Sequence, residues 1–229
     1  MSYRRSAYRI DFETRIQYLK SESIKANKLS HTHHEIRDMV FQCAIFQTSA
    51  ALESYIRLTI ESWFQEIKAR SLGASLPDNV RGHLAVRKLT KTFEKYVATR
   101  DEGAITSSLG SERALWSIMT GSATIPTYIS GTDLHDGTAY PSYKNIHKLF
   151  LRLGINNVHD QVSAILKRDT ETMIESFQSI RTALAHSSPP EITIADVKAR
   201  LSDMSDLVRA LDRVLHRLVN THGGKHCWK

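Results

Sequence analysis

An arginine and a histidine stand close together at the end of a segment that has the pattern of a helix. Arg181 and His186 are separated by four residues, and Ser and Pro follow directly at residues 187–190. On a helix, five steps place the two side chains roughly 140° apart around the axis and about 7.5 Å apart along it. If two copies of this helix end met across a two-fold axis, two arginines and two histidines would surround one point. A phosphate group could bind there.

The pair lies in a segment, residues 160–186, that is predicted to form a single helix. Its apolar residues recur at spacings of four and three, which is typical of one helical face. They are Met173, Phe177, Ile180 and Leu184. The prolines that follow would end this helix. Arg181 is next to the apolar stripe, where a charge is unfavourable unless another group pairs with it.

The remaining pattern predicts an all-α chain. Glycine and proline number only ten and five, and long stretches lack both, which favours helices. Further helices are predicted at residues 5–29, 33–70, 79–99 and 143–153, and after the capping residue Thr193. The last helix has an unbroken heptad seam, which would pack either on another helix of the same bundle or on a second copy of the chain. The seam consists of Ile194, Val197, Leu201, Met204, Val208, Leu211, Leu215 and Leu218.

We therefore expect a single up-and-down helical bundle over residues 1–220. Residues 101–141 are rich in Gly, Ser and Thr, and they are predicted to be a loop-rich insert with one short helix at residues 112–119. Residues 221–229 contain two adjacent glycines and are predicted to be a flexible C-terminal tail.

Three parts of the sequence resemble the HEPN family, in the branches called RiboL-PSP-HEPN and MAE-type HEPN. The first is the Arg-Thr-Ala-Leu-Ala-His run at residues 181–186. The second is Leu-Glu-Ser-Tyr at residues 52–55 in the long early helix, and the third runs from Asn145 to Ile155. The resemblance covers most of residues 5–220. It implies a HEPN-like helical bundle that forms a homodimer, with the Arg and His at the end of the penultimate helix.

The resemblance also implies a metal-independent RNA endonuclease without a cofactor, often a toxin or a phage-defence component. The imidazole of His186 would take the proton from a ribose 2′-OH, because an imidazole titrates near neutral pH. The 2′-oxygen would attack the adjacent phosphorus, while Arg181 stabilises the charge that builds on the phosphate oxygens. The His of a second subunit would protonate the leaving 5′-oxygen. The products would be a 2′,3′-cyclic phosphate and a 5′-hydroxyl, and DNA would not be cleaved.

Two more residues of the same helix are candidate catalytic residues. Thr182 stands where active members of the family often have Asn, Asp or His, and its hydroxyl can still form hydrogen bonds. Glu175 would orient Arg181 or His186, and the alternative is that it is a solvated helix residue. The presence of Thr182 is compatible with an alternative function, a non-catalytic HEPN module that dimerises or regulates a partner protein.

Other histidines and aromatic residues are weaker candidates. His31, His33 and His34 lie at a helix start where alternate residues do not share a face, and no Cys or carboxylate cluster completes a metal site. The same lack of ligands applies to the tail set His222, His226 and Cys227 and to the His-Asp pairs at residues 135–136 and 159–160. The aromatic residues of the long helix are expected in the core rather than stacked on bases; they are Tyr55, Trp63 and Phe64. No metal site is predicted.

The whole chain has a net charge of +7. Its positive charge is concentrated in three segments. Residues 1–30 carry seven basic and three acidic side chains, residues 81–100 six and one, and residues 194–229 seven and four. Such clusters favour a polyanion partner, usually nucleic acid, and solubility is the alternative explanation. With the resemblance, the first two segments are predicted to hold an RNA backbone. A structural bundle that binds DNA would also account for the charge.

The expected compartment is the cytoplasm. No apolar run approaches the roughly 20 residues that cross a bilayer, and the first residues do not have the pattern of a secretory signal. The two cysteines, Cys43 and Cys227, do not make a disulfide framework. We expect RNA, a second copy of the chain and an antitoxin or neighbouring defence protein as partners, and no membrane.

Overall fold

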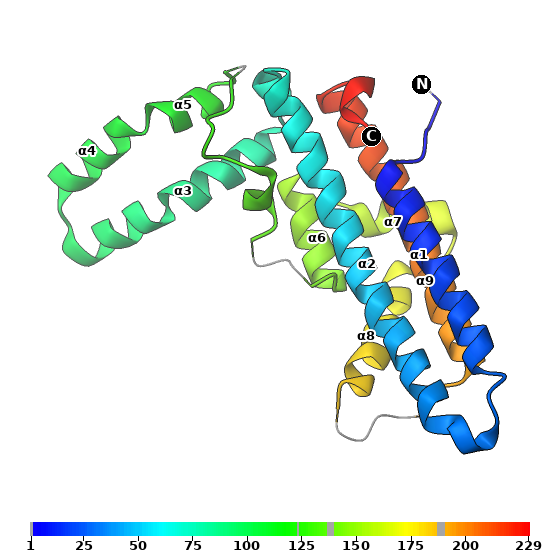
Figure 1. Ribbon diagram of the computed structural model, residues 1–229. Coiled ribbons are helices and arrows are strands. Elements are labelled where there is room, and N and C mark those ends of the chain that lie inside the picture. The colour runs from blue at the N-terminus through cyan, green and yellow to red at the C-terminus, as the bar shows by residue number, and fades with distance from the viewer. Residues whose placement is uncertain (1, 123, 137–139, 187–190) are drawn as a thin grey trace.

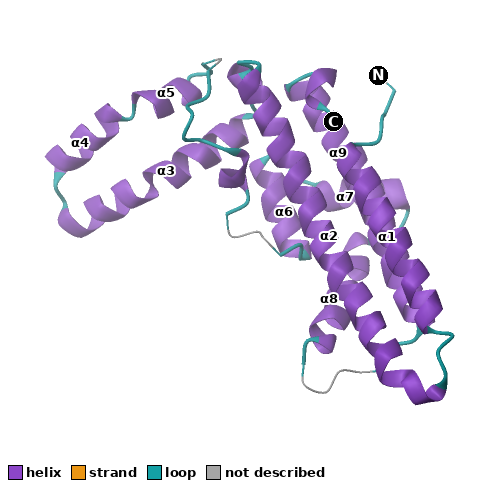
Figure 2. Ribbon diagram, viewed as in Figure 1, coloured by secondary structure: helices purple, strands orange, loops and turns teal. Residues whose placement is uncertain are grey.

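The computed structural model describes residues 2–122, 124–136, 140–186 and 191–229, which form helices joined by loops (Figure 1, Figure 2). No strand occurs in these ranges, so the predicted all-α helical bundle is confirmed. Over the same ranges no helix is both long and apolar enough to cross a membrane. The α-helices are α1 (Ala7–Ala26), α2 (His34–Ala69), α3 (Asp78–Thr99), α4 (Glu102–Ser111), α5 (Arg113–Met119), α6 (Tyr143–Arg152), α7 (Val158–Leu166), α8 (Thr170–Leu184) and α9 (Ile194–His222).

Three long helices, α1, α2 and α9, pack on one another and form the frame of the bundle (Figure 1). α1 buries Phe12, Ile16 and Leu19, at the spacing that predicted the helix. α7 packs on α9, and α8 packs on both α2 and α9. Burial of these apolar faces is the main stabilising contribution, because each fully buried aliphatic or aromatic side chain contributes roughly 1.5–3 kcal/mol.

The heptad seam of α9 packs on other helices of the same chain. Seven of its eight residues, from Val197 to Leu218, are buried, and Ile194 is partly buried. The helices that cover α9 are α1, α2, α7 and α8 of the same chain. Of the two partners that the sequence left open, the structure shows the intramolecular one.

A buried carboxylate ties α9 to the N-terminal segment and to α2. Asp212 has no exposed surface. It accepts hydrogen bonds from Tyr3 Oη at 2.5 Å, Ser6 Oγ at 2.5 Å, Ser6 N at 3.3 Å and Tyr55 Oη at 3.1 Å. Burial, followed by the hydrogen bond to Asp212, raises the pKa of Tyr3 to about 12. Burial and the negative charge of Asp212 also raise the pKa of Tyr55 well above its ordinary value.

The segment predicted as one helix over residues 160–186 is two helices, so that prediction was wrong. α7 ends at Leu166, and Lys167 adopts a left-handed backbone conformation with φ of 54°. Asp169 then caps α8, because its side chain accepts a hydrogen bond from Thr172 N at 2.8 Å. α8 ends at Leu184, and the Ser-Pro stop at residues 187–190 lies outside the described residues.

Helices α3, α4 and α5 form an arm that projects from the bundle (Figure 1). The arm has a small core of its own, made by Ala85, Leu89 and Leu115. The predicted short helix is α5, but the insert also contains α4, which the sequence pattern did not predict. Asp101 caps α4 by accepting a hydrogen bond from Ala104 N at 2.9 Å, and this local signal outweighs the Gly and Ser content of the segment.

The C-terminal residues, expected to be a flexible tail, make specific contacts. α9 extends to His222, and a 3-10 helix, η4 (Lys225–Cys227), follows. Cys227 is buried. Trp228 Nε1 donates to Arg4 O at 2.8 Å, and Lys229 O accepts from Ala7 N at 2.9 Å. The two chain ends therefore lie side by side (Figure 1).

Candidate functional site

Arg181 lies in the last turn of α8 and is held between two aromatic rings. Its guanidinium carbon is 4.9 Å from the ring centroid of Tyr140 and 5.7 Å from that of Phe46. Phe46 belongs to α2, and Tyr140 belongs to the segment that precedes α6. A cation over an aromatic face is stabilised by about 0.5–2 kcal/mol, more when it is shielded from water. The two rings therefore help to hold the guanidinium in place at the end of α8.

The segment that carries Tyr140, residues 140–142, is anchored from two helices, and we call it the strap. Gln178, one turn before Arg181 on α8, donates from Nε2 to Pro141 O at 3.0 Å. Asn145 of α6 donates from Nδ2 to Tyr140 O at 2.8 Å. Ser142 accepts from Asn145 N at 3.2 Å and caps α6. The strap thus places the Tyr140 ring through hydrogen bonds to the elements on both sides of it.

Three polar atoms around Arg181 are buried and unused. Arg181 Nε, Tyr140 Oη and Gln178 Oε1 have no hydrogen-bond partner within the described part of the chain. Over the same residues, Arg181 forms no ion pair. Buried polar groups almost always have a partner, and water or an added ligand can supply the bonds that these three atoms lack in the described chain. The cluster offers donors to an anion and one amide acceptor.

His186 lies beyond the end of α8 and is exposed. Its backbone N–H donates to Ala183 O at 3.2 Å, while the described residues include no hydrogen bond or ring contact that joins its side chain to Arg181. The 140° offset calculated from the sequence does not apply, because the helix ends at Leu184. The imidazole is therefore positioned by the chain just after the helix rather than by the helix itself.

The other two candidate residues do not join Arg181. Thr182 and Glu175 are both exposed, and neither forms a hydrogen bond or ion pair with Arg181 or His186 among the residues described. Glu175 is six residues before Arg181, which places it about 120° around α8 from Arg181. Within one chain, the structure assembles Arg181 with Phe46, Tyr140 and Gln178 instead.

Sequence patterns did not identify Phe46, Tyr140 and Gln178 as site residues. Phe46 fits the apolar pattern that predicts the helix at residues 33–70, and Tyr140 and Pro141 lie inside the insert predicted to be loop-rich. The one local signal was the order Tyr140-Pro141-Ser142, in which a proline and a capping serine fix the start of α6. Nothing in that signal indicates that the ring of Tyr140 covers an arginine 41 positions later in the chain.

The histidines of the two His-Asp pairs lie in partly or fully buried surroundings. His159 is buried, stacks on the Tyr143 ring with centroids 3.7 Å apart, and its Nε2 lies 3.0 Å from Tyr143 O. Burial lowers its pKa below the ordinary value. Burial, followed by the positive charges of Arg57 and Arg152, lowers the pKa of His135 to about 4. In the part of the chain that is described, no group of three or more His, Cys, Asp or Glu side chains is arranged to hold a metal ion.

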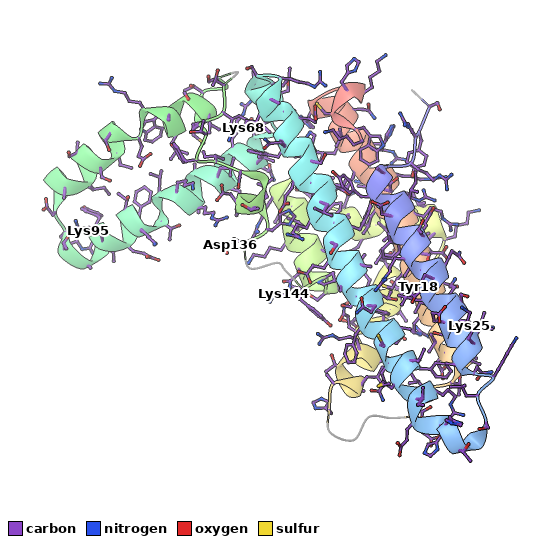
Figure 3. The ribbon with its side chains drawn as sticks, in the orientation of Figure 1. Tyr18, Lys25, Lys68, Lys95, Asp136 and Lys144 are labelled. Atoms are coloured by element: carbon purple, nitrogen blue, oxygen red, sulfur yellow. The ribbon has the colours of Figure 1, made fainter. Side chains whose placement is uncertain are left out.

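The basic α3 helix divides into a paired half and an unpaired half. Arg87 and Lys88 form ion pairs with Asp133 at 3.2 Å and 3.7 Å. Lys91 and Lys95 line a groove between α3 and α4, and among the described residues neither forms an ion pair. Lys95 lies on the inner side of the arm (Figure 3). The free positive charge of this helix is therefore in the outer half of the arm.

Comparison of the chain with models of protein families, with curated proteins and with solved structures finds no match. The assignment of a function therefore rests on the residues and on the geometry around Arg181. The HEPN resemblance stays a prediction from the motifs at residues 52–55, 145–155 and 181–186.

Proposed function

We propose that the chain is a HEPN-type endoribonuclease that acts as a homodimer and needs no metal ion. The observation that carries this proposal is the state of Arg181. Its guanidinium lies over the rings of Phe46 and Tyr140, its Nε is buried without a partner among the described residues, and an exposed histidine follows just after the end of the same helix. A fixed, unpaired guanidinium is suited to bind a phosphate and to stabilise charge that develops on it.

The reaction needs one base, one acid and one anion-binding group. His186 removes the proton of the ribose 2′-OH, and the 2′-oxygen forms a bond to the adjacent phosphorus. Arg181 stabilises the charge on the non-bridging oxygens while the bond to the 5′-oxygen breaks. The protonated His186 of a second copy gives its proton to that oxygen. The products are a 2′,3′-cyclic phosphate and a 5′-hydroxyl, and the protons balance between the two histidines.

A second copy is needed because one chain supplies only one of the two proton-transfer groups. Glu175 and Thr182 are both exposed, and among the described residues neither forms a hydrogen bond or ion pair with Arg181. The outer face of α2 next to Phe46 offers an apolar surface for such a copy. There, Ile36 and Met39 are 47% and 63% exposed and Cys43 is also exposed. A second copy on this face would bring its own Arg181 and His186 toward the first pair.

The proposed setting is a toxin or phage-defence component in the cytoplasm, held in check by an antitoxin or a neighbouring defence protein. The proposed substrate is single-stranded RNA. The unpaired lysines of α3, Lys91 and Lys95, and the basic residues of the first 30 positions would contact its backbone, because Lys and Arg side chains provide most of the affinity for phosphates. Such binding weakens as salt is added.

Cleavage of single-stranded RNA in the presence of EDTA tests the proposal. We expect the wild type to cleave and to leave 2′,3′-cyclic phosphate ends. His186→Ala and Arg181→Ala should each lower the rate by roughly 100-fold or more. His33→Ala, which changes another exposed histidine, should leave the rate unchanged. A requirement for added metal, or full activity in His186→Ala, would overturn the proposal.

A second candidate function is a non-catalytic HEPN module that binds a partner protein. Two observations favour it: Thr182 follows Arg181, and no contact joins Arg181 to His186 in the described chain. Expression in cells separates the two candidates. An unrestrained ribonuclease slows growth and His186→Ala relieves this effect, whereas a binding module gives equal growth with both chains.

A further inference from the structure

A groove lies where the two ends of the chain meet. Its walls come from the segment before α1, the last turns of α9, and η4 with the residue that follows it (Figure 1). The groove is open to solvent and has a volume of about 460 Å³, which is within the range of about 300–1,000 Å³ for ligand sites. We call it the terminal groove. Its lining includes Arg4, His216, Asn220, Lys225, His226 and Trp228.

Positive charge from both ends of the sequence gathers around this groove. Residues 2–9 and 213–229 together contain seven Arg and Lys side chains, and neither stretch contains Asp or Glu. Two of the three basic segments of the sequence, residues 1–30 and 194–229, therefore meet here. No acidic side chain of the described residues lines the groove.

Carboxylates on the helices around the groove already have partners. Glu66 of α2 pairs with Lys229 at 2.6 Å, and Glu13 of α1 pairs with Arg5 at 3.2 Å. Asp212 of α9 is fully buried and accepts hydrogen bonds from three other residues. None of these acidic groups neutralises the side chains that line the groove.

Three cations at the groove and beside it are unpaired. Arg4, Arg217 and Lys225 are exposed, and they form no ion pair with any residue that the structure describes. Arg217 follows directly on His216, which lines the groove. These three side chains can therefore form charge-assisted hydrogen bonds to an added anion.

His216 adds a neutral donor to the same groove. Asn220 donates from Nδ2 to His216 Nε2 at 2.9 Å, so the proton of the neutral imidazole is on Nδ1. Nδ1 has no hydrogen-bond partner among the described residues. Burial lowers the pKa of His216 below its ordinary value, which keeps this ring uncharged at neutral pH.

Trp228 places an aromatic ring beside these donors. Its Nε1 donates to Arg4 O at 2.8 Å, and its ring is nearly perpendicular to that of His216, with 5.2 Å between the centroids. The side chain is partly exposed. A positively charged groove with an aromatic ring on which a base can stack is the usual arrangement for binding single-stranded nucleic acid.

The surface around the groove is polar. Within residues 2–9 and 213–229, no large apolar side chain is exposed among the residues described. A surface that enters a membrane interface presents apolar side chains as well as cations. Nucleic acid therefore fits this groove better than a lipid surface does.

The terminal groove is remote from Arg181. Glu66, which pairs with Lys229, follows Phe46 by 20 residues on α2. The two positions are thus about 30 Å apart along the helix axis. Figure 1 shows the C-terminus and the end of α8 at opposite ends of the bundle. A ligand in the groove does not occupy the proposed cleavage site.

We propose that the terminal groove is a second anion site, which binds the phosphate backbone of a single-stranded nucleic acid. Arg4, Arg217 and Lys225 contact the phosphates, and a base stacks on Trp228. These contacts do not involve a ribose 2′-OH, so the groove accepts DNA as well as RNA. Binding there does not depend on the proposed cleavage reaction.

Binding of a labelled single-stranded DNA of about ten nucleotides to the full-length chain tests the proposal. DNA lacks the 2′-OH, so the proposed reaction cannot consume it during the measurement. With three cations on three phosphates, the logarithm of the association constant should fall by about 2 for each tenfold rise in salt. RNA of the same sequence should bind to the His186→Ala chain with similar affinity.

Two double variants locate the binding site. Arg4→Gln with Lys225→Gln should weaken DNA binding roughly tenfold or more and reduce the salt dependence to about 0.7 for each tenfold change. Neither side chain has a hydrogen bond or an ion pair in the described chain, so the fold should be unchanged. Arg5→Gln with Lys20→Gln removes the same two charges from the surface between α1 and α9, which Glu13 also lines. This control should bind as the wild type does.

The alternative outcomes each count against one proposal. No DNA binding, equal loss in the two double variants, or equally tight binding of poly-glutamate or of anionic lipid vesicles would overturn the terminal groove. RNA cleavage without DNA binding overturns the groove and leaves the ribonuclease standing. DNA binding that is lost only in Arg4→Gln with Lys225→Gln, without RNA cleavage, overturns the ribonuclease alone.

Discussion

The guanidinium of Arg181 lies over the ring of Tyr140, with 4.9 Å between its central carbon and the ring centroid. The arginine comes from the end of α8 and the tyrosine from the strap, so two segments far apart in the sequence meet at the proposed anion site. The hydroxyl of Tyr140 is buried without a partner among the described residues. The ring and the hydroxyl of this residue are therefore expected to have separate roles.

Tyr140→Phe and Tyr140→Leu separate the two roles. Tyr140→Phe keeps the aromatic face over Arg181 and removes a buried hydroxyl that has no partner, so stability should be unchanged or slightly higher. Tyr140→Leu removes the cation–π contact and should lower the free energy of unfolding by about 1–2 kcal/mol. Denaturant unfolding of both variants measures this. Equal destabilisation by Phe and by Leu would mean that the hydroxyl, not the ring, makes the stabilising contact.

Asp212→Asn should strongly destabilise the bundle. The carboxylate accepts from Tyr3, Ser6 and Tyr55, and an amide would turn one acceptor into a donor that faces these donors. Hydrogen bonds to a charged group contribute about 1.5–3 kcal/mol each, so we expect a loss of about 2–4 kcal/mol in thermal or denaturant unfolding. The matched change Asp206→Asn affects partly exposed ion pairs with Arg168 and Arg209. This variant should lower the free energy of unfolding by less than about 1 kcal/mol. A similar loss in both variants would contradict the central role of Asp212.

Helix positions followed from the sequence where apolar residues repeat over many turns. The prediction of a helix over residues 33–70 matches α2 (His34–Ala69) within one residue at each end. The break at Lys167 was missed because one capping residue, Asp169, decides it within a continuous apolar pattern. α4 was not predicted because its segment has few apolar residues and so no helical pattern. Its start is set by the capping residue Asp101. Local capping hydrogen bonds are worth about 1 kcal/mol each, which is too little to stand out in a pattern of burial.

The candidate site could be predicted only in part. The Arg181 and His186 pair and its place at a helix end are visible in the sequence, because both depend on near neighbours. The partners of Arg181 are not visible, since Phe46 is 135 positions away and Tyr140 lies in an irregular segment. Periodicity gives the face of a helix but not which distant ring covers it. The expected roles of Thr182 and Glu175 stay predictions.

Acidification should weaken the fold through His135. Its pKa falls from 6.5 to about 4 on folding, so between these values the unfolded chain binds more protons than the folded chain. Stability therefore falls as the pH is lowered from about 6.5 to about 4 and changes little below that through this group. The loss is at most about 3 kcal/mol, at 1.36 kcal/mol for each pKa unit. Burial also lowers the pKa of His83 and of His159, so these two histidines act on stability in the same direction as His135.

Unfolding free energies at pH 7 and pH 4.5 measure this loss. His135→Gln removes the titrating group and should make the difference between the two pH values smaller. His33→Gln, at an exposed position, should leave the difference as in the wild type. An undiminished loss in His135→Gln would assign the acid sensitivity to other groups.

Trp228→Ala should loosen the start of α1. The indole donates to Arg4 O at 2.8 Å and its ring meets the edge of the His216 ring at 5.2 Å, while the next residue accepts from Ala7 N. We expect faster backbone hydrogen exchange at Ala7 and a loss of about 1–3 kcal/mol in stability, since a partly buried aromatic and one hydrogen bond are removed. Trp116→Ala provides the control, because Trp116 belongs to the arm and donates to Leu109 O at 2.8 Å. In Trp116→Ala, the change in hydrogen exchange should stay within α4 and α5. Unchanged exchange at Ala7 in Trp228→Ala would show that the C-terminal residues do not hold the N-terminal segment.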